Sequence, residues 1–209
     1  MVTKENLLSV LEEELDTASI TDIHTHIYPA EFKDLSLWGI DELLTYHYLA
    51  AEYFRFSAMK YDEFYSLPTT RQAELIWQTV FIDNTPVSEA ARGVLTVLNE
   101  LGLDVSSRDL NAYRSYFQAL SPAEYINKVF DISRVKQVVM TNDPFDHEER
   151  NIWETIGNKD NRFKAALRLD VLLNEYEKAA ECLTGWGYIT NQELSEQTFM
   201  AVRQFLKDW

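Results

Sequence analysis

The chain has 209 residues, of which 46% are hydrophobic, with six glycines and five prolines. This is the composition of a folded globular protein with one domain or two. Its 34 acidic and 19 basic residues give a formal net charge of −15, which argues against binding to nucleic-acid phosphates or to anionic membranes.

The single cysteine, Cys182, excludes an internal disulfide and argues against a cysteine-rich zinc or iron–sulfur site. We expect it to pack as a small residue on a helix face. The first twenty residues contain acidic side chains and no continuous apolar core, so they do not read as a signal peptide. No run approaches the roughly 20 apolar residues that a membrane span needs. We therefore expect a soluble cytoplasmic protein.

Residues 3–16 predict an amphipathic helix with Thr3 as its N-cap. Its leucines follow helical spacing: Leu7, Leu8, Leu11 and Leu15. The next stretch, SITDIHTHI at residues 19–27, is short and rich in β-branched residues. It predicts a strand that ends in two histidines.

From about residue 31 to residue 130 the sequence predicts helices and no second strand. Five segments have helical spacing: 39–56, 70–81, 88–103, 109–120 and 122–132. Prolines and a glycine separate them, and Ser88 and Ser121 are expected to begin two of the helices. About a hundred helical residues therefore follow the first strand.

The pattern changes after residue 130. Residues 135–140 and about 163–169 predict buried strands, while 151–156, 174–186 and 190–209 predict helices. Alternating strands and helices indicate parallel strands covered by helices.

His24 and His26 are one residue apart, and on a strand their side chains would lie on the same face. Two neighbouring imidazoles can bind one divalent ion, yet a two-ligand pattern is weaker than a full ligand set. On spacing alone, a metal site and a pair of satisfied structural histidines both stay open. Asp22 shares their face, and we favour a capped strand end over an acceptor that orients a histidine ring.

Arg168 and Asp170 lie on one face at the end of a predicted strand. A buried arginine needs a partner, and we favour Asp170 over a substrate carboxylate. In residues 141–149, Pro144 supports a turn with aspartate caps rather than a site. His47 and Tyr48 fall inside a helical pattern, where the simplest interpretation is an aromatic core face.

Four motifs resemble the uronate (glucuronate) isomerases: TDIHTHIYP, LWGIDELLTYHYLAAEYFR, VVMTNDPFD and FKAALRLDVLLNEY. The similarity runs from about residue 18 to residue 209. That family belongs to the amidohydrolase superfamily of metal-binding (β/α)8 barrels. The implied fold is α/β, the N-terminal part of a TIM-type barrel with a large helical insertion after the first strand. The implied divisions are 1–26 for the first helix and strand, 27–130 for the insertion, and 131–209 for two further strand–helix units.

The resemblance implies interconversion of D-glucuronate with D-fructuronate and of D-galacturonate with D-tagaturonate. His24 and His26 would be metal ligands of the first strand, for zinc or, alternatively, manganese. His47 and Tyr48 match positions that line the substrate pocket, and Arg168 matches an arginine that meets the substrate anion. The implied catalytic and substrate-binding residues are thus His47, Tyr48 and Arg168, and the implied partner is a small sugar acid.

These residue types suit an aldose–ketose isomerisation. The reaction removes a proton from C2 and returns one to C1 through an enediol. A metal polarises the carbonyl, an arginine suits a carboxylate, and a histidine or tyrosine moves a proton near neutral pH.

The chain departs from the family in length. A closed barrel needs eight strands and about 250 residues, whereas we count three expected strands. The family's later strands, including the one that supplies an aspartate ligand and a second arginine, have no counterpart in this sequence. We therefore expect a fragment with little or no activity alone. Its unpaired sheet edges would need cover from the missing barrel half or from another copy of the chain.

Two other functions stay open. One is a metal-dependent hydrolase of amides or esters from the same superfamily, although such enzymes usually take more metal ligands from later strands. The other is a non-catalytic helical module whose acidic surface binds a partner. Metal affinity that depends on the two histidines would argue against the binding module.

Overall fold

The computed structural model describes residues 2–35, 38–156, 160–188, 193 and 195–209. The chain forms two compact units. The sheet unit comprises Met1–Phe32 and Val135–Trp209, and the helical unit comprises Lys33–Arg134. The sequence divisions placed the helical insertion at 27–130. Each unit is described by itself below.

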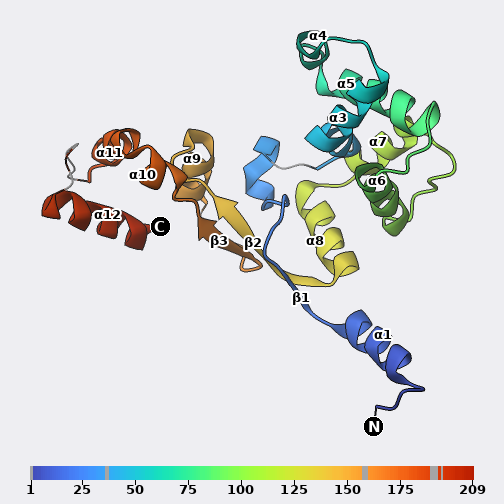
Figure 1. The fold of residues 1–209 in the computed structure, drawn as a ribbon, viewed down its shortest axis with the longest axis horizontal. Helices are drawn as coiled ribbons and strands as arrows, with labels where there is room; N and C mark the ends of the chain where they lie inside the picture. Colours follow the sequence, from blue (N-terminus) through green and yellow to red (C-terminus); the bar gives the residue numbers. More distant parts are fainter. Residues whose placement is uncertain (1, 36–37, 157–159, 189–192, 194) are drawn as a thin grey trace. The chain divides into compact units, whose positions relative to one another are not determined.

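Three parallel strands form one sheet among the described residues of the sheet unit (Figure 1): β1 (Ile20–Asp22), β2 (Val135–Asn142) and β3 (Phe163–Leu167), in the order β1-β2-β3. Met140 lies opposite Ala165, and Asn142 lies opposite Leu167. The α/β class with parallel strands is therefore confirmed. β2 reaches two residues beyond the predicted 135–140, and β3 stops two residues short of the predicted 169.

β1 is much shorter than the strand predicted over residues 19–27. It ends at Asp22, so the expectation that the two histidines lie on the strand is wrong. The Asp22 carboxylate accepts a hydrogen bond from the backbone N–H of His24 at 3.0 Å, and the Thr25 hydroxyl accepts one from Ile27 at 3.1 Å. Such local side-chain bonds offer the backbone an alternative to pairing with β2.

Five α-helices belong to the described part of the sheet unit: α1 (Leu7–Thr17), α9 (His147–Thr155), α10 (Asp170–Asn174), α11 (Tyr176–Gly185) and α12 (Glu196–Asp208). A 3₁₀ helix, η1 (Ala30–Leu35), follows β1. The helix predicted over 174–186 divides at Glu175, whose φ of −130° and ψ of 51° are not helical. The last predicted helix begins after Ser195, and residues 190–192 and 194 of that prediction lie outside the described residues.

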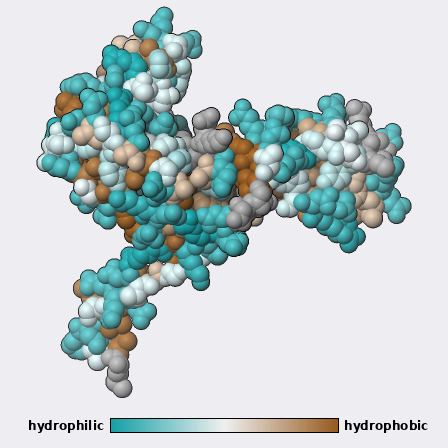
Figure 2. All heavy atoms as spheres, turned by 180° about the vertical axis from the view of Figure 1, so that it is seen from behind, coloured by the Kyte–Doolittle hydropathy of each residue, from teal (hydrophilic) through white to brown (hydrophobic). Residues whose placement is uncertain are grey.

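Helix α1 forms where an amphipathic helix was predicted, but it begins later. Asn6 precedes its first residue, and the Asn6 side chain accepts a hydrogen bond from the backbone N–H of Thr3 at 2.6 Å. The expectation that Thr3 is the N-cap is therefore wrong. No residue from Leu7 to Thr17 is buried, and the four leucines of the stripe are exposed (Figure 2).

The helical unit contains α2 (Ile40–Thr45), α3 (His47–Phe56), α4 (Tyr61–Tyr65), α5 (Thr69–Ile76), a π-helix η2 (Trp77–Ile82), α6 (Glu89–Glu100), α7 (Leu110–Gln118) and α8 (Pro122–Ser133). As predicted, no strand occurs among its described residues. Both predicted caps are confirmed, since the hydroxyl of Ser88 accepts from Ala91 and that of Ser121 from Glu124. The segment 39–56, predicted as one helix, is broken at Tyr46, where φ is −59° and ψ is 140°.

Each unit has its own apolar core. In the helical unit the core includes Ile40, Leu44, Leu49, Tyr53, Phe64, Ile76, Leu98, Tyr113 and Phe117. In the sheet unit one cluster joins α10, α11 and α12 through Val171, Leu172, Ala179, Leu183 and Phe205. Across the described residues, no helix combines the length and apolar character needed to traverse a bilayer.

Candidate functional site

His24 and His26 lie just past the carboxyl end of β1, and both side chains are exposed. Their ring centroids are 5.4 Å apart and the rings are inclined at 80°. Two imidazoles on one tetrahedral zinc ion have centroids about 5 Å apart, because each Zn–N bond is about 2.0–2.1 Å long. The spacing of the pair therefore fits two ligands of one divalent ion.

No group of three or more His, Cys, Asp and Glu side chains suited to a metal ion occurs within the described ranges. Asp22 bonds the backbone of His24, which agrees with the capped strand end that we favoured. As predicted ligands, the two histidines would supply two donors, and a complete coordination shell needs more.

Arg168 follows the last residue of β3 and precedes α10. Its Nε donates to Asp170 Oδ2 at 3.3 Å, which confirms the predicted ion pair. The premise that Arg168 is buried is wrong, since the two side chains are 50% and 61% exposed. The backbone N–H of Arg168 bonds to the carbonyl of Asn142 at 2.7 Å and so fixes the backbone at this position. The guanidinium itself is only loosely held by an exposed partner.

His47 and Tyr48 open helix α3 in the helical unit. Their rings and that of Tyr46 form a small aromatic group: the centroids are 4.2 Å apart for Tyr46 and His47, and 4.1 Å apart for His47 and Tyr48. Both His47 and Tyr48 are exposed, so their interpretation as an aromatic core face is wrong. The buried face of α3 is instead formed by Leu49, Ala50 and Tyr53.

Tyr48 lines an open cavity of about 690 Å³ in the helical unit. Glu52 and Arg55, one and two helical turns further along α3, share this wall, and Ser88 and Glu89 at the start of α6 form the other. The Ser88 hydroxyl donates to Glu52 Oε2, which ties the two walls together. The lining of the cavity therefore combines a tyrosine, an arginine and two glutamates.

A smaller cavity of about 300 Å³ lies in the sheet unit, at the end of β2. Asn142 is buried there and its amide donates to Glu149 Oε1 at 2.6 Å; burial raises the pKa of the Glu149 carboxyl. Arg150 packs its guanidinium 3.7 Å from the ring centre of Trp186. We did not single out Asn142 or Arg150 in the sequence. Asn142 follows the predicted strand 135–140, and this position at a strand end could have identified it as a candidate site residue.

The turn predicted over residues 141–149 is confirmed only for residues 143–146, because β2 extends to Asn142 and α9 begins at His147. Asp143 accepts from the backbone N–H of Phe145 at 2.9 Å, and Asp146 accepts from Glu149 at 2.8 Å as the N-cap of α9. Both aspartate side chains therefore cap backbone N–H groups, as the sequence predicted.

The chain was compared with known proteins. A uronate isomerase from Bacillus halodurans C-125, whose crystal structure is solved, superposes with a TM-score of 0.93 and 45% sequence identity over 100% of this chain. The resemblance to the uronate isomerases is confirmed. The chain spans 50% of the length of that uronate isomerase. No family model matches the sequence, and no curated protein matches it.

The similarity to the uronate isomerase includes both units, because the superposition covers 100% of this chain. His24, His26 and Arg168 belong to the sheet unit, whereas His47 and Tyr48 belong to the helical unit. Within a unit, the structure brings the two histidines together and places His47 beside Tyr48. The roles that the family resemblance gives to these five residues stay predictions.

Proposed function

We propose that this chain is part of a uronate isomerase that interconverts D-glucuronate with D-fructuronate and D-galacturonate with D-tagaturonate. The observation that carries the proposal is the 45% identity to a uronate isomerase over the whole chain, together with the TM-score of 0.93. Because the chain spans half the length of that enzyme, we propose that it has little or no activity by itself.

In this proposal β1, β2 and β3 are three strands of a (β/α)8 barrel. The parallel order β1-β2-β3 supports it, since every barrel of this class is built from parallel strands that are neighbours in sequence order. Among the residues that the structure describes, β1 and β3 each have one neighbour in the sheet. We propose that the other barrel strands, or a second copy of the chain, cover these two edges.

His24 and His26 would hold a divalent ion, zinc or manganese, and their ring spacing supports this assignment. A bound divalent cation supplies charge stabilisation at the substrate carbonyl oxygen. Arg168 would bind the sugar-acid carboxylate, which requires exchange of its exposed Asp170 partner for the substrate. The His47 imidazole and the Tyr48 phenol would move the proton between C2 and C1.

Metal binding tests the assignment of the histidines. We expect zinc or manganese titrated into the 209-residue chain, followed by calorimetry, to show one site that His24→Ala with His26→Ala abolishes. His147→Ala removes another histidine of the sheet unit and serves as the control, with affinity unchanged. Equal metal affinity in the double variant would contradict the proposed ligands.

The activity of the chain is measured with D-glucuronate in the presence of the same metal. We expect little or no turnover to D-fructuronate. Turnover comparable to that of ordinary isomerases would show that the other half of a barrel is dispensable, and the proposal of a partial enzyme would be wrong.

A further inference from the structure

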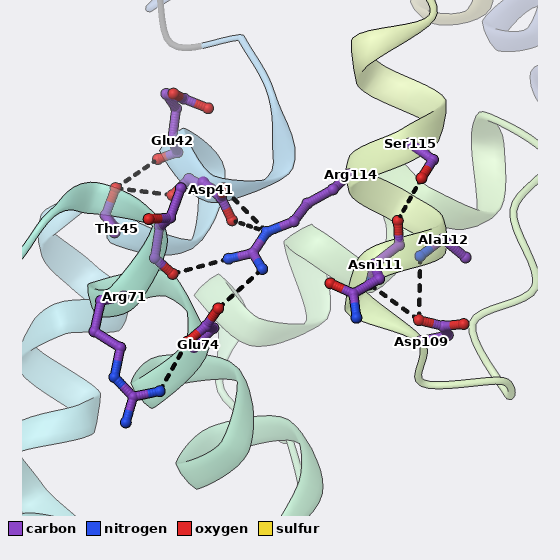
Figure 3. Close-up of polar contacts among 11 residues, drawn as sticks. Asp41, Glu42, Thr45, Arg71, Glu74, Asp109, Asn111, Ala112, Arg114 and Ser115 are labelled. Carbon is purple, nitrogen blue, oxygen red and sulfur yellow. Dashed lines mark hydrogen bonds and ion pairs between the residues drawn. The ribbon is translucent and has the colours of Figure 1, made fainter.

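One arginine side chain joins three helices of the helical unit. Arg114, on α7, donates from Nε to both carboxylate oxygens of Asp41 on α2, at 2.9 and 3.1 Å. Its Nη1 donates to Glu74 Oε1 on α5 at 3.1 Å, and its Nη2 to the carbonyl oxygen of Thr70 at 2.8 Å. Figure 3 shows the Arg114 guanidinium between the side chains of Asp41 and Glu74. α2, α5 and α7 are therefore tied through a single guanidinium.

This ion pair is largely removed from water. The side chains of Arg114 and Asp41 are 16% and 14% exposed. A charge left without its partner at such a position is strongly disfavoured, because its desolvation is not offset by an ion pair. Arg71 makes a second bond to Glu74, but those side chains are 57% and 40% exposed, so this pair contributes little. Arg114, and not Arg71, holds the group together.

The chain leads directly from the ion pair to the aromatic group of α3. Asp41 lies in the first turn of α2, and its carbonyl accepts a hydrogen bond from the Thr45 hydroxyl at 2.8 Å (Figure 3). Ile40 and Leu44 are buried on the same helix. Tyr46 alone connects Thr45 to His47, the first residue of α3.

Because Tyr46 is the only residue between α2 and α3, its two backbone dihedral angles set the direction of α3 relative to α2. α3 is held on its other side by the buried Leu49, Ala50 and Tyr53. The direction of His47 and Tyr48 thus depends on where α2 ends. Asp41 pairs with Arg114 in the first turn of the same short helix.

We propose that Arg114 is a positioning residue, which acts through Asp41 and α2 to orient the His47 and Tyr48 side chains. The importance of this orientation for a sugar acid rests on the proposed function. The coupling of Arg114 to His47 is a property of the helical unit and is measured without substrate.

The test uses the full 209-residue chain and the ring resonances of its four histidines in NMR spectra. We expect Arg114→Met and Asp41→Asn to shift the His47 resonances and to change its ring contacts with Tyr46 and Tyr48. His24, His26 and His147 belong to the sheet unit and are internal references that should not move. Arg71→Met is the matched control: it removes the other arginine on Glu74 and leaves the Asp41 pair intact.

The Arg114→Lys variant and stability measurements separate a positioning role of Arg114 from a general stabilising role. Arg114→Lys keeps the charge beside Asp41 and should restore the His47 resonances in part, while denaturation curves report stability separately. The proposal is overturned if His47 is unchanged in a folded Arg114→Met variant, or if Arg71→Met moves it equally. Loss of the folded helical unit in Arg114→Met, Arg114→Lys and Asp41→Asn alike would also overturn it, because Arg114 would then act on the whole unit.

The proposed function is judged by a separate measurement. Addition of D-glucuronate and zinc to the unmodified chain should move the resonances of His24, His26 and His47. If they stay in place while Arg114→Met still moves His47, the proposed function fails and the positioning role stands.

Discussion

Tyr188 and Asp208 line the 300 Å³ cavity of the sheet unit, where the Tyr188 hydroxyl donates to Asp208 Oδ2 at 2.8 Å. Burial, the hydrogen bond and the nearby negative charge together raise the pKa of Tyr188 to about 12. The neutral phenol is therefore favoured in the folded chain over a wider pH range than in the unfolded chain, where a tyrosine pKa is about 10.

A raised pKa predicts how stability changes with pH. The contribution of Tyr188 is fully present below about pH 10 and is lost as the pH rises through about 12, because the unfolded chain releases the proton first. In an absorbance titration of tyrosinate, Tyr188→Phe should remove an ionisation near pH 12. Asp208→Asn should lower the pKa of Tyr188, since it removes the neighbouring charge. A difference curve for Tyr188→Phe centred near pH 10 would contradict the raised pKa of Tyr188.

At the scale of elements, α8 carries a complete N-terminal cap. The Ser121 hydroxyl accepts from the backbone N–H of Glu124, and the Glu124 carboxylate accepts from the backbone N–H of Ser121 at 2.8 Å. Pro122 occupies the first helical position, where its missing N–H costs nothing. α8 ends at Ser133, and Arg134, with a φ of 56°, turns the chain into β2.

The cap of α8 makes a measurable contribution to stability. We expect Ser121→Ala to lower the free energy of unfolding by about 1 kcal/mol, because the backbone N–H of Glu124 loses the hydroxyl that accepts its hydrogen bond. Ser115→Ala is the control: the Ser115 hydroxyl donates to the Asn111 carbonyl within α7 and caps no terminus, so its removal should have little effect. Urea denaturation compares the two variants, and equal losses would argue against the cap.

At the scale of the molecule, the apolar residues divide into separate clusters. Phe205, fully buried on α12, packs among the rings of Phe145, Trp186 and Tyr188, with centroids 5.7, 6.0 and 5.9 Å away. Leu98, fully buried on α6, belongs to the core of the helical unit. The two clusters share no residue.

Separate cores predict local responses to truncation. Phe205→Ala should cost about 3–5 kcal/mol and Leu98→Ala about 2–5 kcal/mol, because each leaves a cavity in a packed core. Hydrogen exchange followed by mass spectrometry should show faster exchange in α10–α12 for Phe205→Ala and in the helical unit for Leu98→Ala. If each variant accelerates exchange equally in both units, the chain unfolds as one cooperative body and the division into units has no energetic meaning.

Features that depend on neighbours along the chain could be predicted from the amino-acid sequence. Helical spacing located most helices, and the runs of β-branched and apolar residues located the two longer strands. Ser88 and Ser121 were identifiable as caps because a cap bonds a backbone group three residues away. Four motifs spread along the chain also indicated the isomerase family, and one solved structure confirms the resemblance.

The points at which local patterns end, and the contacts between side chains far apart in the sequence, could be read only from the three-dimensional structure. β1 ends at Asp22 rather than at the histidines, and Arg168 is half exposed rather than buried. The leucine stripe of α1 is exposed although its periodicity is that of a packed helix. Arg114 and Asp41 are 73 residues apart, and no periodicity links them. Spacing reports the neighbours of a residue along one element, whereas burial and ion pairing depend on which other elements lie against it.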